Sequence, residues 1–381
     1  MDIYSIYRRG EANLYRTALI LSEPYGGGHT KAAKAVSKLL KDWNYPILEL
    51  GNYLHPRLSS HLTRGYLKTV QKAPWIWGKL YSSPITESQL IPYMYRKIYT
   101  TKLAALLLQT KPDVIIATHP LPAIAISSLR KYKIDLPLVG VVTDFHIHPS
   151  RSLADWNVLC IPSQVVPSWL DNTTGIVPTG IPVQPSFHTT LSKPLAKKNL
   201  NLDLSKPVVL WMGGSDGFLQ DLEWVSMCSK DPSTQWLFVT GRNRKLFNTL
   251  QDNYRKYPHL QIYGYVDDIS TLMDASDLLV TKPGGVTCSE AIHKGLPLLL
   301  TNGVTGQEEE NRSFLLQQGL ADYCASHEIK EKSQAMISNF DNLERIKWNM
   351  LRYKHSIQPN RIASTVEMFL GQNCIGHSPY H

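Results

Sequence analysis

The stretch ALILSEPYGGGHTKAAKAVSKLLK, Ala18–Lys41, joins an apolar run, a glycine-rich turn and a helical pattern in direct succession. The apolar run Ala18–Leu21 is short and unbroken, which is typical of a parallel strand that is buried on both faces. The segment Lys31–Lys41 has the apolar spacing of a helix. A strand that leads through a glycine turn into a helix is the repeating unit of a parallel α/β sheet, so this stretch predicts that fold class.

The same unit recurs along the chain. Further apolar runs of this kind are Pro46–Leu50, Val114–Ala117, Leu136–Val142, Val158–Ile161, Val208–Met212, Trp236–Val239, Leu260–Tyr265, Leu278–Thr281 and Leu296–Leu300. Helical segments lie between several of them, for example Leu219–Cys228, Arg244–Tyr254 and Val286–Lys294. These units suffice for two doubly wound sheets, as expected for a chain of 381 residues.

The boundary between two domains is predicted within Leu191–Pro207, which is polar, rich in lysine and bracketed by prolines. Residues 1–195 would then form an N-terminal Rossmann-like domain, and residues 196–354 a C-terminal one. The segment Ile357–Leu370 has a helical pattern. A helix over about residues 355–372 is therefore expected to pack back on the first domain.

The composition is that of a folded globular protein, with 43% hydrophobic and 19% charged residues. The five cysteines are widely scattered without metal-ligand spacing, which indicates reduced thiols in the cytosol. The segment Met1–Arg16 lacks the apolar core of a signal peptide, and no apolar run is long enough to span a bilayer. We therefore expect a cytoplasmic protein without a transmembrane helix.

The positive charge is concentrated in the first half of the chain. Residues 1–195 contain 21 Lys and Arg against 11 Asp and Glu, whereas residues 196–381 contain 19 against 20. The net charge of +9 therefore comes from the first domain. This asymmetry suggests that the first domain meets a polyanion, either a nucleic acid or an anionic membrane.

One segment, residues 57–102, combines basic and aromatic side chains. It holds eight Lys and Arg, a single acid, Glu87, and the aromatic residues Tyr66, Trp75, Trp77, Tyr81, Tyr93, Tyr95 and Tyr99. Trp and Tyr favour the bilayer interface, and basic side chains favour anionic headgroups. The alternative is a core-packed helical hairpin with a solvated basic face. The charge asymmetry favours the membrane, with contact residues Trp75, Trp77, Tyr81, Arg96 and Lys97.

Two more glycine-rich turns follow apolar runs in the second half, at Met212–Gly217 and at Thr281–Glu290. In parallel α/β sheets, ligands bind at the carboxyl ends of the strands. The helix after such a turn presents unpaired N–H groups and a partial positive charge, which suit a phosphate. None of the turns has the Walker P-loop spacing. The sequence therefore predicts a phosphate site of another kind.

The sequence resembles glycosyltransferase family 28, in particular the monogalactosyldiacylglycerol synthases and the processive diacylglycerol glucosyltransferases. The resemblance runs from about Thr17 to about Tyr323 and is carried by LILSEPYGGGHTKAAKAV, GVVTDFHIHPSR, TGIPVQPSF, VVLWMGGSDG, FVTGRNRKL, YGYVDDISTLMDASDLLVTKPGGVTCSEA and GQEEENRSFLLQQG. It implies the GT-B fold, in which two Rossmann-like domains face each other across a cleft. The nucleotide-sugar donor would bind the C-terminal domain, and the acceptor would enter from the N-terminal one.

The resemblance also implies roles for residues of the second domain. The uracil would lie near Val266, and the carboxylate of Glu290 would hold the ribose hydroxyls. The other implied donor-binding residues are Gly284, Gly285 and Val286 for the pyrophosphate, with Gly214 and Ser215 nearby, Gln307 and Glu308 for the hexose, and Arg242 and Asn243 for the wall of the cleft. Thr287, in the third glycine motif, and Asn311, which closes the motif of Gln307, are also implied to bind the donor. The resemblance implies no bound metal and no cofactor beyond the UDP-sugar, because helix dipoles and cations would offset the charge of the departing UDP.

Inverting transfer needs a base that takes the proton of the acceptor hydroxyl. His29 is the first candidate, because an imidazole titrates near neutrality and because Gly27 and Gly28 leave room for the acceptor. Asp144, at the end of the strand-like run LVGVVTD, is the second candidate, with a capping role as its alternative.

The resemblance implies the inverting transfer of a hexose from UDP-glucose or UDP-galactose to diacylglycerol or a glycosyl-diacylglycerol. The protein would associate peripherally with anionic phospholipid at the inner face of the cell membrane. The alternative is a UDP-sugar transferase that acts on a polyprenyl-linked or other non-glycerolipid acceptor. A nucleic-acid-binding protein is disfavoured because the sequence lacks a known nucleic-acid module. A catalytically inactive UDP-sugar sensor is disfavoured because His29, Glu290 and Gln307 are all present.

Overall fold

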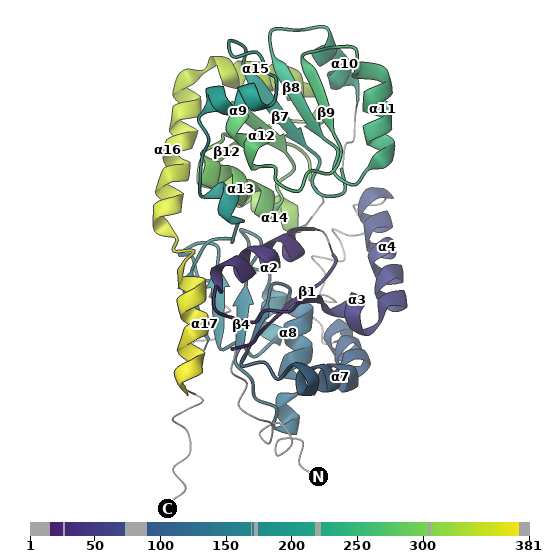
Figure 1. Ribbon diagram of the computed structural model, residues 1–381, viewed down its shortest axis with the longest axis vertical. Coiled ribbons are helices and arrows are strands. Elements are labelled where there is room, and N and C mark those ends of the chain that lie inside the picture. Colours follow the sequence, from purple (N-terminus) through teal and green to yellow (C-terminus); the bar gives the residue numbers. More distant parts are fainter. Residues whose placement is uncertain are drawn as a thin grey trace, which may run out of the picture. The chain divides into compact units, whose positions relative to one another are not determined.

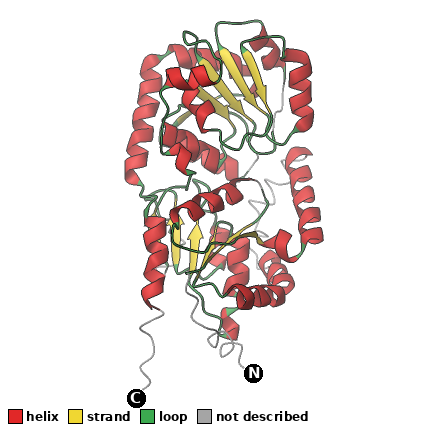
Figure 2. Cartoon of the chain, viewed as in Figure 1, coloured by secondary structure: helices red, strands yellow, loops and turns green. Residues whose placement is uncertain are grey.

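Two six-stranded sheets, in which every strand pair is parallel, form the framework of the protein in the computed structural model (Figures 1 and 2). The structure describes residues 16–25, 27–72, 90–168, 170, 174–217, 222–303 and 306–372. Its chain divides into two units: it passes from the first to the second between Pro182 and Val183 and returns between Ser356 and Ile357.

The sheet of the first unit has the strand order β2-β1-β3-β4-β5-β6. Its strands are β1 (Ala18–Ser22), β2 (Ile47–Glu49), β3 (Val114–Ala117), β4 (Leu138–Val141), β5 (Val158–Ile161) and β6 (Gly175–Pro178). The helices that the structure describes in this unit are α2 (Gly27–Leu39), α3 (Leu50–Leu54), α4 (Pro56–Lys72), α7 (Leu90–Thr110), α8 (Pro120–Ser127) and α17 (Arg361–Gln372), with the short 3-10 helices η1 (Arg130–Tyr132) and η2 (Pro149–Leu153).

Both faces of this sheet are covered, as its unbroken apolar strands require. Leu19, Leu21 and Ile115 point to one face, where they pack with side chains of α7 and α8. The neighbouring residues Ala18 and Ile20 point to the other face, where they pack with α2 and α17. Figure 1 shows α17 beside this sheet, so the C-terminal helix belongs to the core of the first unit.

The sheet of the second unit has the order β12-β11-β10-β7-β8-β9. Its strands are β7 (Val208–Met212), β8 (Gln235–Val239), β9 (Leu260–Tyr263), β10 (Leu278–Thr281), β11 (Leu298–Leu300) and β12 (Ala321–Tyr323). Its helices are α9 (Lys193–Asn199), α10 (Glu223–Ser229), α11 (Arg244–Tyr254), α12 (Ser270–Ala275), α13 (Gly285–Lys294), α14 (Gln307–Gln317), α15 (Ile329–Ser338) and α16 (Phe340–Ser356), with the 3-10 helices η3 (Pro185–Phe187) and η4 (Ser326–Glu328).

A cluster of large aromatic side chains fills one side of the second sheet. Trp211 on β7, Trp236 and Phe238 on β8, and Trp224 on α10 are all buried. Their ring centroids lie 5.6 to 6.3 Å apart, at distances favourable for aromatic contact. Trp211, which lies in the apolar run that leads to the second glycine turn, is therefore a core residue of this unit. The predicted α/β fold class with two doubly wound sheets is confirmed.

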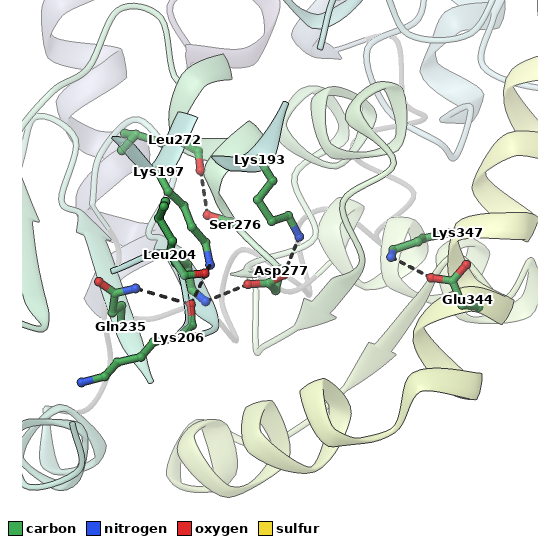
Figure 3. Close-up of polar contacts among 11 residues, drawn as sticks. Lys193, Lys197, Leu204, Lys206, Gln235, Leu272, Ser276, Asp277, Glu344 and Lys347 are labelled. Carbon is green, nitrogen blue, oxygen red and sulfur yellow. Dashed lines mark hydrogen bonds and ion pairs between the residues drawn. The ribbon is translucent and has the colours of Figure 1, made fainter. Parts of the chain in front are cut away.

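The segment Leu191–Pro207, predicted as the linker between domains, is instead an ordered part of the second unit. Its residues 193–199 form α9, which packs on α12. Lys193 forms an ion pair with Asp277, and the Lys197 ammonium donates to the carbonyl oxygens of Lys206 (2.6 Å) and Leu204 (3.4 Å), as Figure 3 shows. Lys193 and Lys197 thus bond to a carboxylate and to backbone oxygens of their own unit, so the lysine content of this segment does not mark a domain boundary.

The first glycine turn also differs from its prediction. Helix α2 begins at Gly27 and not near Lys31, so His29 lies in the first turn of the helix. Neither Gly27 nor Gly28 has a positive φ. Their backbone is helical, and the absence of a side chain, not a left-handed conformation, distinguishes these two positions.

Two aromatic residues of the predicted membrane segment are core residues. Tyr95 and Tyr99 on α7 are 7% and 3% exposed, and their rings stack with centroids 4.0 Å apart. Tyr95 donates its hydroxyl proton to the buried carboxylate of Glu23, which also accepts from the Gly51 N–H. Both tyrosines therefore cannot contact a membrane, and the core-packed alternative is correct for this side of α7.

Candidate active site

His29, Thr118 and Thr143 come together because their strands are neighbours in the first sheet. Strand β3 lies between β1 and β4. His29 follows β1, Thr118 follows β3 directly, and Thr143 lies two residues beyond β4. The carboxyl ends of parallel strands meet at one edge of the sheet, where α/β proteins place their ligand sites.

The hydrogen bonds of His29 determine which ring nitrogen carries the proton. Its Nδ1 lies 3.0 Å from the backbone oxygen of Thr118 and 2.9 Å from Oγ1 of Thr143. A carbonyl oxygen only accepts, so Nδ1 is the N–H donor. In the neutral ring, Nε2 then has a lone pair that can take a proton.

The surroundings of His29 adjust its basicity. Burial lowers the pKa of His29 from its ordinary value, and the nearby Arg151 guanidinium lowers it further, while the Asp144 carboxylate opposes both. The ring of His119 meets that of His29 edge-on with centroids 4.7 Å apart. Burial also lowers the pKa of His119 well below its usual range. Both imidazoles are thus neutral at pH 7.

Sequence reasoning found His29 and Asp144 but missed three neighbours. Thr143 donates its hydroxyl proton to Oδ2 of Asp144 over 3.3 Å. His119 caps α8, because its side chain accepts from the Leu121 N–H at 3.2 Å. Arg151 is 4% exposed; burial lowers its pKa to about 10, and the Asp144 carboxylate partly opposes this effect. Each missed residue stands in or beside a short polar stretch after an apolar run. That position could have indicated that these residues lie near the carboxyl ends of the strands.

In the second unit, the glycine turns also lie at the carboxyl ends of neighbouring strands. Gly214 and Gly217 follow β7, and Gly241 follows β8. All three have positive φ, of 74°, 59° and 58°, which only glycine adopts without strain. The Arg242 N–H donates to the backbone oxygen of Ser215 at 2.9 Å and so connects the turn after β8 to the turn after β7.

Asn243 and Arg242 have different surroundings. Asn243 is the N-cap of α11: its Oδ1 accepts from the Leu246 N–H, and its Nδ2 donates to the Gly217 oxygen, both at 3.0 Å. Arg242 lies over the ring of Tyr265, 5.2 Å from its centroid. Tyr265 is partly exposed and precedes Val266, the residue expected near the uracil. Asn243 therefore orients the glycine turn, and Arg242 lines the edge to which Tyr265 belongs.

The third glycine turn brings a cation to the same edge. Lys282 follows β10 and forms an ion pair with Glu308 on α14. A Cβ atom at Gly214 would lie 2.8 Å from Cε of Lys282, so the lysine side chain passes close to the glycine turn after β7. Sequence reasoning missed Lys282 although it stands beside the glycines of TKPGG. Its ammonium adds positive charge near the predicted phosphate site.

The remaining predicted donor residues belong to α13 and α14. Gly284 caps α13, which starts at Gly285 and contains Val286 and Thr287. Glu290 on the same helix is 2% exposed. On α14, Gln307 is the first residue, and the buried Asn311 donates to the Pro283 oxygen at 3.1 Å. Asn311 thereby ties α14 to the third glycine turn.

The predicted membrane contacts are only partly visible. Trp75, Trp77 and Tyr81 lie outside the residues that the structure describes, as does the side chain of Arg96. Lys97 is exposed on α7, on the same face as the exposed side chains of Tyr93, Met94 and Ile98. Within the described ranges, every helix is too short or too polar to cross a membrane.

Two family profiles match consecutive parts of the chain. The profile of the monogalactosyldiacylglycerol (MGDG) synthase family matches residues 29–183, and that of the glycosyltransferase family 28 C-terminal domain matches residues 208–349. A processive diacylglycerol beta-glucosyltransferase of Bacillus pumilus is 29% identical over 361 residues, which cover 91% of this chain and 94% of that protein. A protein of the same name from Staphylococcus haemolyticus is 28% identical over 337 residues, which cover 86% and 85%.

Solved structures of glycosyltransferases share the fold. CalG4, the calicheamicin glycosyltransferase, has a TM-score of 0.60 at 14% identity, with 95% of this chain and all of CalG4 covered. MurG of Acinetobacter baumannii has a TM-score of 0.56 at 15% identity, with 93% and 99% covered. Anabaena Alr3699/HepE in complex with UDP-glucose has a TM-score of 0.54 at 13% identity, with 93% and 99% covered. These structures show that the chain has the GT-B fold. By its family profiles and its relatives, the chain belongs to glycosyltransferase family 28, in its monogalactosyldiacylglycerol synthase and processive diacylglycerol glucosyltransferase group.

Proposed function

We propose that this glycosyltransferase moves a hexose from a UDP-sugar to diacylglycerol or a glycosyl-diacylglycerol. The observation that carries the proposal is the similarity to processive diacylglycerol beta-glucosyltransferases, which extends over most of both chains and includes both units. The family-profile match of the first unit includes His29 and the whole polar edge around it. We therefore assign binding of the acceptor to the first unit, which contains the candidate base.

In this proposal, His29 acts as the general base. Its Nε2 takes the proton of the acceptor hydroxyl, while the acceptor oxygen forms a bond to the anomeric carbon of the hexose. The bond from that carbon to the phosphate oxygen breaks at the same time, and UDP leaves with the bonding electrons. Attack from the face opposite to UDP inverts the anomeric centre.

The second unit would bind the donor. In this proposal, the pyrophosphate would lie at the N-terminus of α13, where unpaired N–H groups and a partial positive charge suit a phosphate. Lys282 and Arg242 would add cationic charge as UDP departs, and Glu290 would accept hydrogen bonds from the ribose hydroxyls. With these groups, we expect transfer without a bound metal ion, and activity should survive treatment with a chelator.

The proposed place of action is the surface of an anionic membrane. The basic excess of residues 1–195 and the exposed face of α7, with Lys97 beside apolar side chains, support peripheral binding. Diacylglycerol is itself confined to the bilayer, so binding there raises the local concentration of the acceptor.

The test is a product analysis with separate donors. Purified protein is incubated with vesicles that contain dioleoylglycerol and anionic phospholipid, and with UDP-glucose, UDP-galactose or UDP-GlcNAc in turn. Mass spectrometry should detect mono- or oligohexosyl-diacylglycerol with one donor, and the His29→Gln variant should form far less. Clear UDP binding without any glycolipid product would contradict the proposed acceptor, and polyprenyl-linked acceptors would then be screened.

A further inference from the structure

We propose that Thr143 is a positioning residue for proton transfer, because its hydroxyl connects the imidazole of His29 to the carboxylate of Asp144. The inference rests on the proposed function in that it assigns the base role to His29. Thr143 itself touches neither substrate nor reacting atoms in this arrangement. It acts through the His29 imidazole, whose protonated Nδ1 it holds in place.

The geometry defines one consistent chain of donors and acceptors. Thr143 is 3% exposed, and its Oγ1 lies 2.9 Å from Nδ1 of His29. The same hydroxyl donates its proton to Oδ2 of Asp144 at 3.3 Å. With that proton directed to Asp144, a lone pair of Oγ1 faces the imidazole and accepts from the Nδ1–H. The Nδ1–H is thus shared between Thr143 and the Thr118 carbonyl.

The opposite arrangement is unfavourable. If the Thr143 hydroxyl donated to a bare Nδ1, the lone pair of that nitrogen would lie 3.0 Å from the oxygen of Thr118, another acceptor. The Asp144 carboxylate would also lose the Thr143 donor. Both losses occur in a largely buried site, where unsatisfied polar groups are costly.

This arrangement suits both charge states of His29. When Nε2 takes the acceptor proton, the Nδ1–H keeps its two acceptors, and no group has to turn. The Asp144 anion, linked through Thr143, stabilises the imidazolium that forms. Among the residues that the structure describes, His119, before α8, and Arg151, on η2, also face His29, and neither replaces this link.

The experiment compares three variants of the full-length protein. Thr143→Val removes the hydroxyl and keeps the branched shape, whereas Thr143→Ser keeps the hydroxyl. Thr17→Val is the matched control. Thr17 is also buried, but it lies just before β1, at the edge of the sheet opposite to the site. Its Oγ1 has no hydrogen-bond partner among the described residues. The measurements are kcat and KM in the vesicle assay, kcat/KM against pH, and the 15N chemical shifts of the His29 ring.

Thr143→Val should lower kcat about 10-fold or more with little change in the KM of the donor, as expected when a hydrogen bond to a group that becomes charged is lost. The acid limb of its kcat/KM profile should move to lower pH, because the imidazolium has lost an acceptor. Thr143→Ser and Thr17→Val should match the wild-type protein in both respects. Equal losses in Thr143→Ser and Thr143→Val, or a Thr143→Val enzyme with wild-type kcat and pH profile, would overturn the proposal.

The ring shifts need no substrate, so they separate this inference from the proposed function. In the wild-type protein and in Thr143→Ser, neutral His29 should show a protonated Nδ1 and a bare Nε2. Thr143→Val should keep this tautomer, because the Thr118 carbonyl still accepts from the Nδ1–H, but its His29 should have a lower pKa. A bare Nδ1 in the wild-type protein would overturn the inference even if the enzyme is active. The predicted shifts in a protein that glycosylates no lipid would support Thr143 while contradicting the proposed acceptor.

Discussion

At the scale of single residues, the state of His29 determines the pH range of the reaction. Burial lowers its pKa below the ordinary value of 6.5, and Asp144 only partly opposes this effect. The base must be neutral to act, so kcat/KM should rise with pH through a limb below pH 6.5 and be level near pH 7. A profile between pH 5 and 8 checks this. His29→Gln should abolish the limb and lower kcat by roughly 10²-fold or more.

Glu290 provides a residue-scale test of the donor site. It is buried on α13, in the helix that begins at the third glycine turn. Glu290→Gln keeps the shape of the side chain but replaces one acceptor oxygen by a donor, which suits two ribose hydroxyls less well. We expect the Kd of UDP to rise about 10-fold in calorimetric titration. Unaltered UDP affinity in a folded Glu290→Gln protein would contradict the proposed contact between Glu290 and the ribose.

The candidate site was only partly predictable from the sequence at this scale. His29 and Asp144 could be named because each follows an apolar run and carries suitable chemistry. Thr143 could not, because its role depends on β1, β3 and β4 being neighbours, and strand order is not written in any local pattern. For Asn243, the sequence indicated the cleft, but its side-chain hydrogen bonds make it the cap of α11.

At the scale of elements, the cap of α11 can be tested directly. Asn243→Ala removes the acceptor for the Leu246 N–H and the donor to Gly217, which holds the glycine turn. We expect the free energy of unfolding to fall by about 1 kcal/mol, the usual cost of losing such a cap. Urea unfolding measures the change. Asn253→Ala on the exposed side of the same helix is the matched control and should change stability little.

The Glu23 carboxyl, which follows β1 and bonds to α3 and α7, should make the stability of the protein depend on pH. Burial raises the pKa of Glu23 from 4.5 to about 7, although Tyr95 and Gly51 donate to its carboxylate. A carboxyl whose pKa is raised on folding stabilises the protein below its unfolded pKa, and this contribution is lost as pH rises to about 7. The loss amounts to about 3 kcal/mol.

The measurement compares wild-type protein and Glu23→Gln by urea unfolding at pH 5 and pH 8. The advantage of the wild-type protein over the variant should shrink at the higher pH. The lowered pKa values of His29 and His119 act in the opposite direction, because the unfolded state binds more protons at these groups. Both proteins contain these histidines, so their contribution cancels in the difference. An advantage that grows with pH would show that Glu23 is stabilised as an anion.

At the scale of the whole molecule, the fold was more predictable than its boundaries. Repeated strand–turn–helix units indicate two parallel sheets, because buried parallel strands leave unbroken apolar runs. The boundary was harder, since the composition of Leu191–Pro207 resembles that of a linker. Its lysines instead bond to backbone oxygens and Asp277 within the second unit (Figure 3). Similarly, the sequence of α7 cannot show that Tyr95 and Tyr99 turn inward while Lys97 and Tyr93 turn outward.

Membrane binding also belongs to the whole molecule, and a matched pair of variants tests it. The first variant replaces Trp75 and Trp77 by Ala and Arg96 and Lys97 by Gln. The control makes the same kinds of change on α16 of the second unit, at the exposed aromatic residues Phe340 and Trp348 and at Lys347 and Arg352. Both variants lose two aromatic and two basic side chains, so they lose the same net charge.

Sedimentation with vesicles of anionic and of neutral phospholipid distinguishes the two surfaces. Each basic side chain near an anionic surface contributes about 1 kcal/mol, so the first variant should bind anionic vesicles at least 10-fold more weakly. Binding by the wild-type protein should fall with salt, because screening weakens this attraction. The α16 control should bind like the wild-type protein. Equal weakening in both variants would mean that net charge, and not the segment of residues 57–102, brings the protein to the membrane.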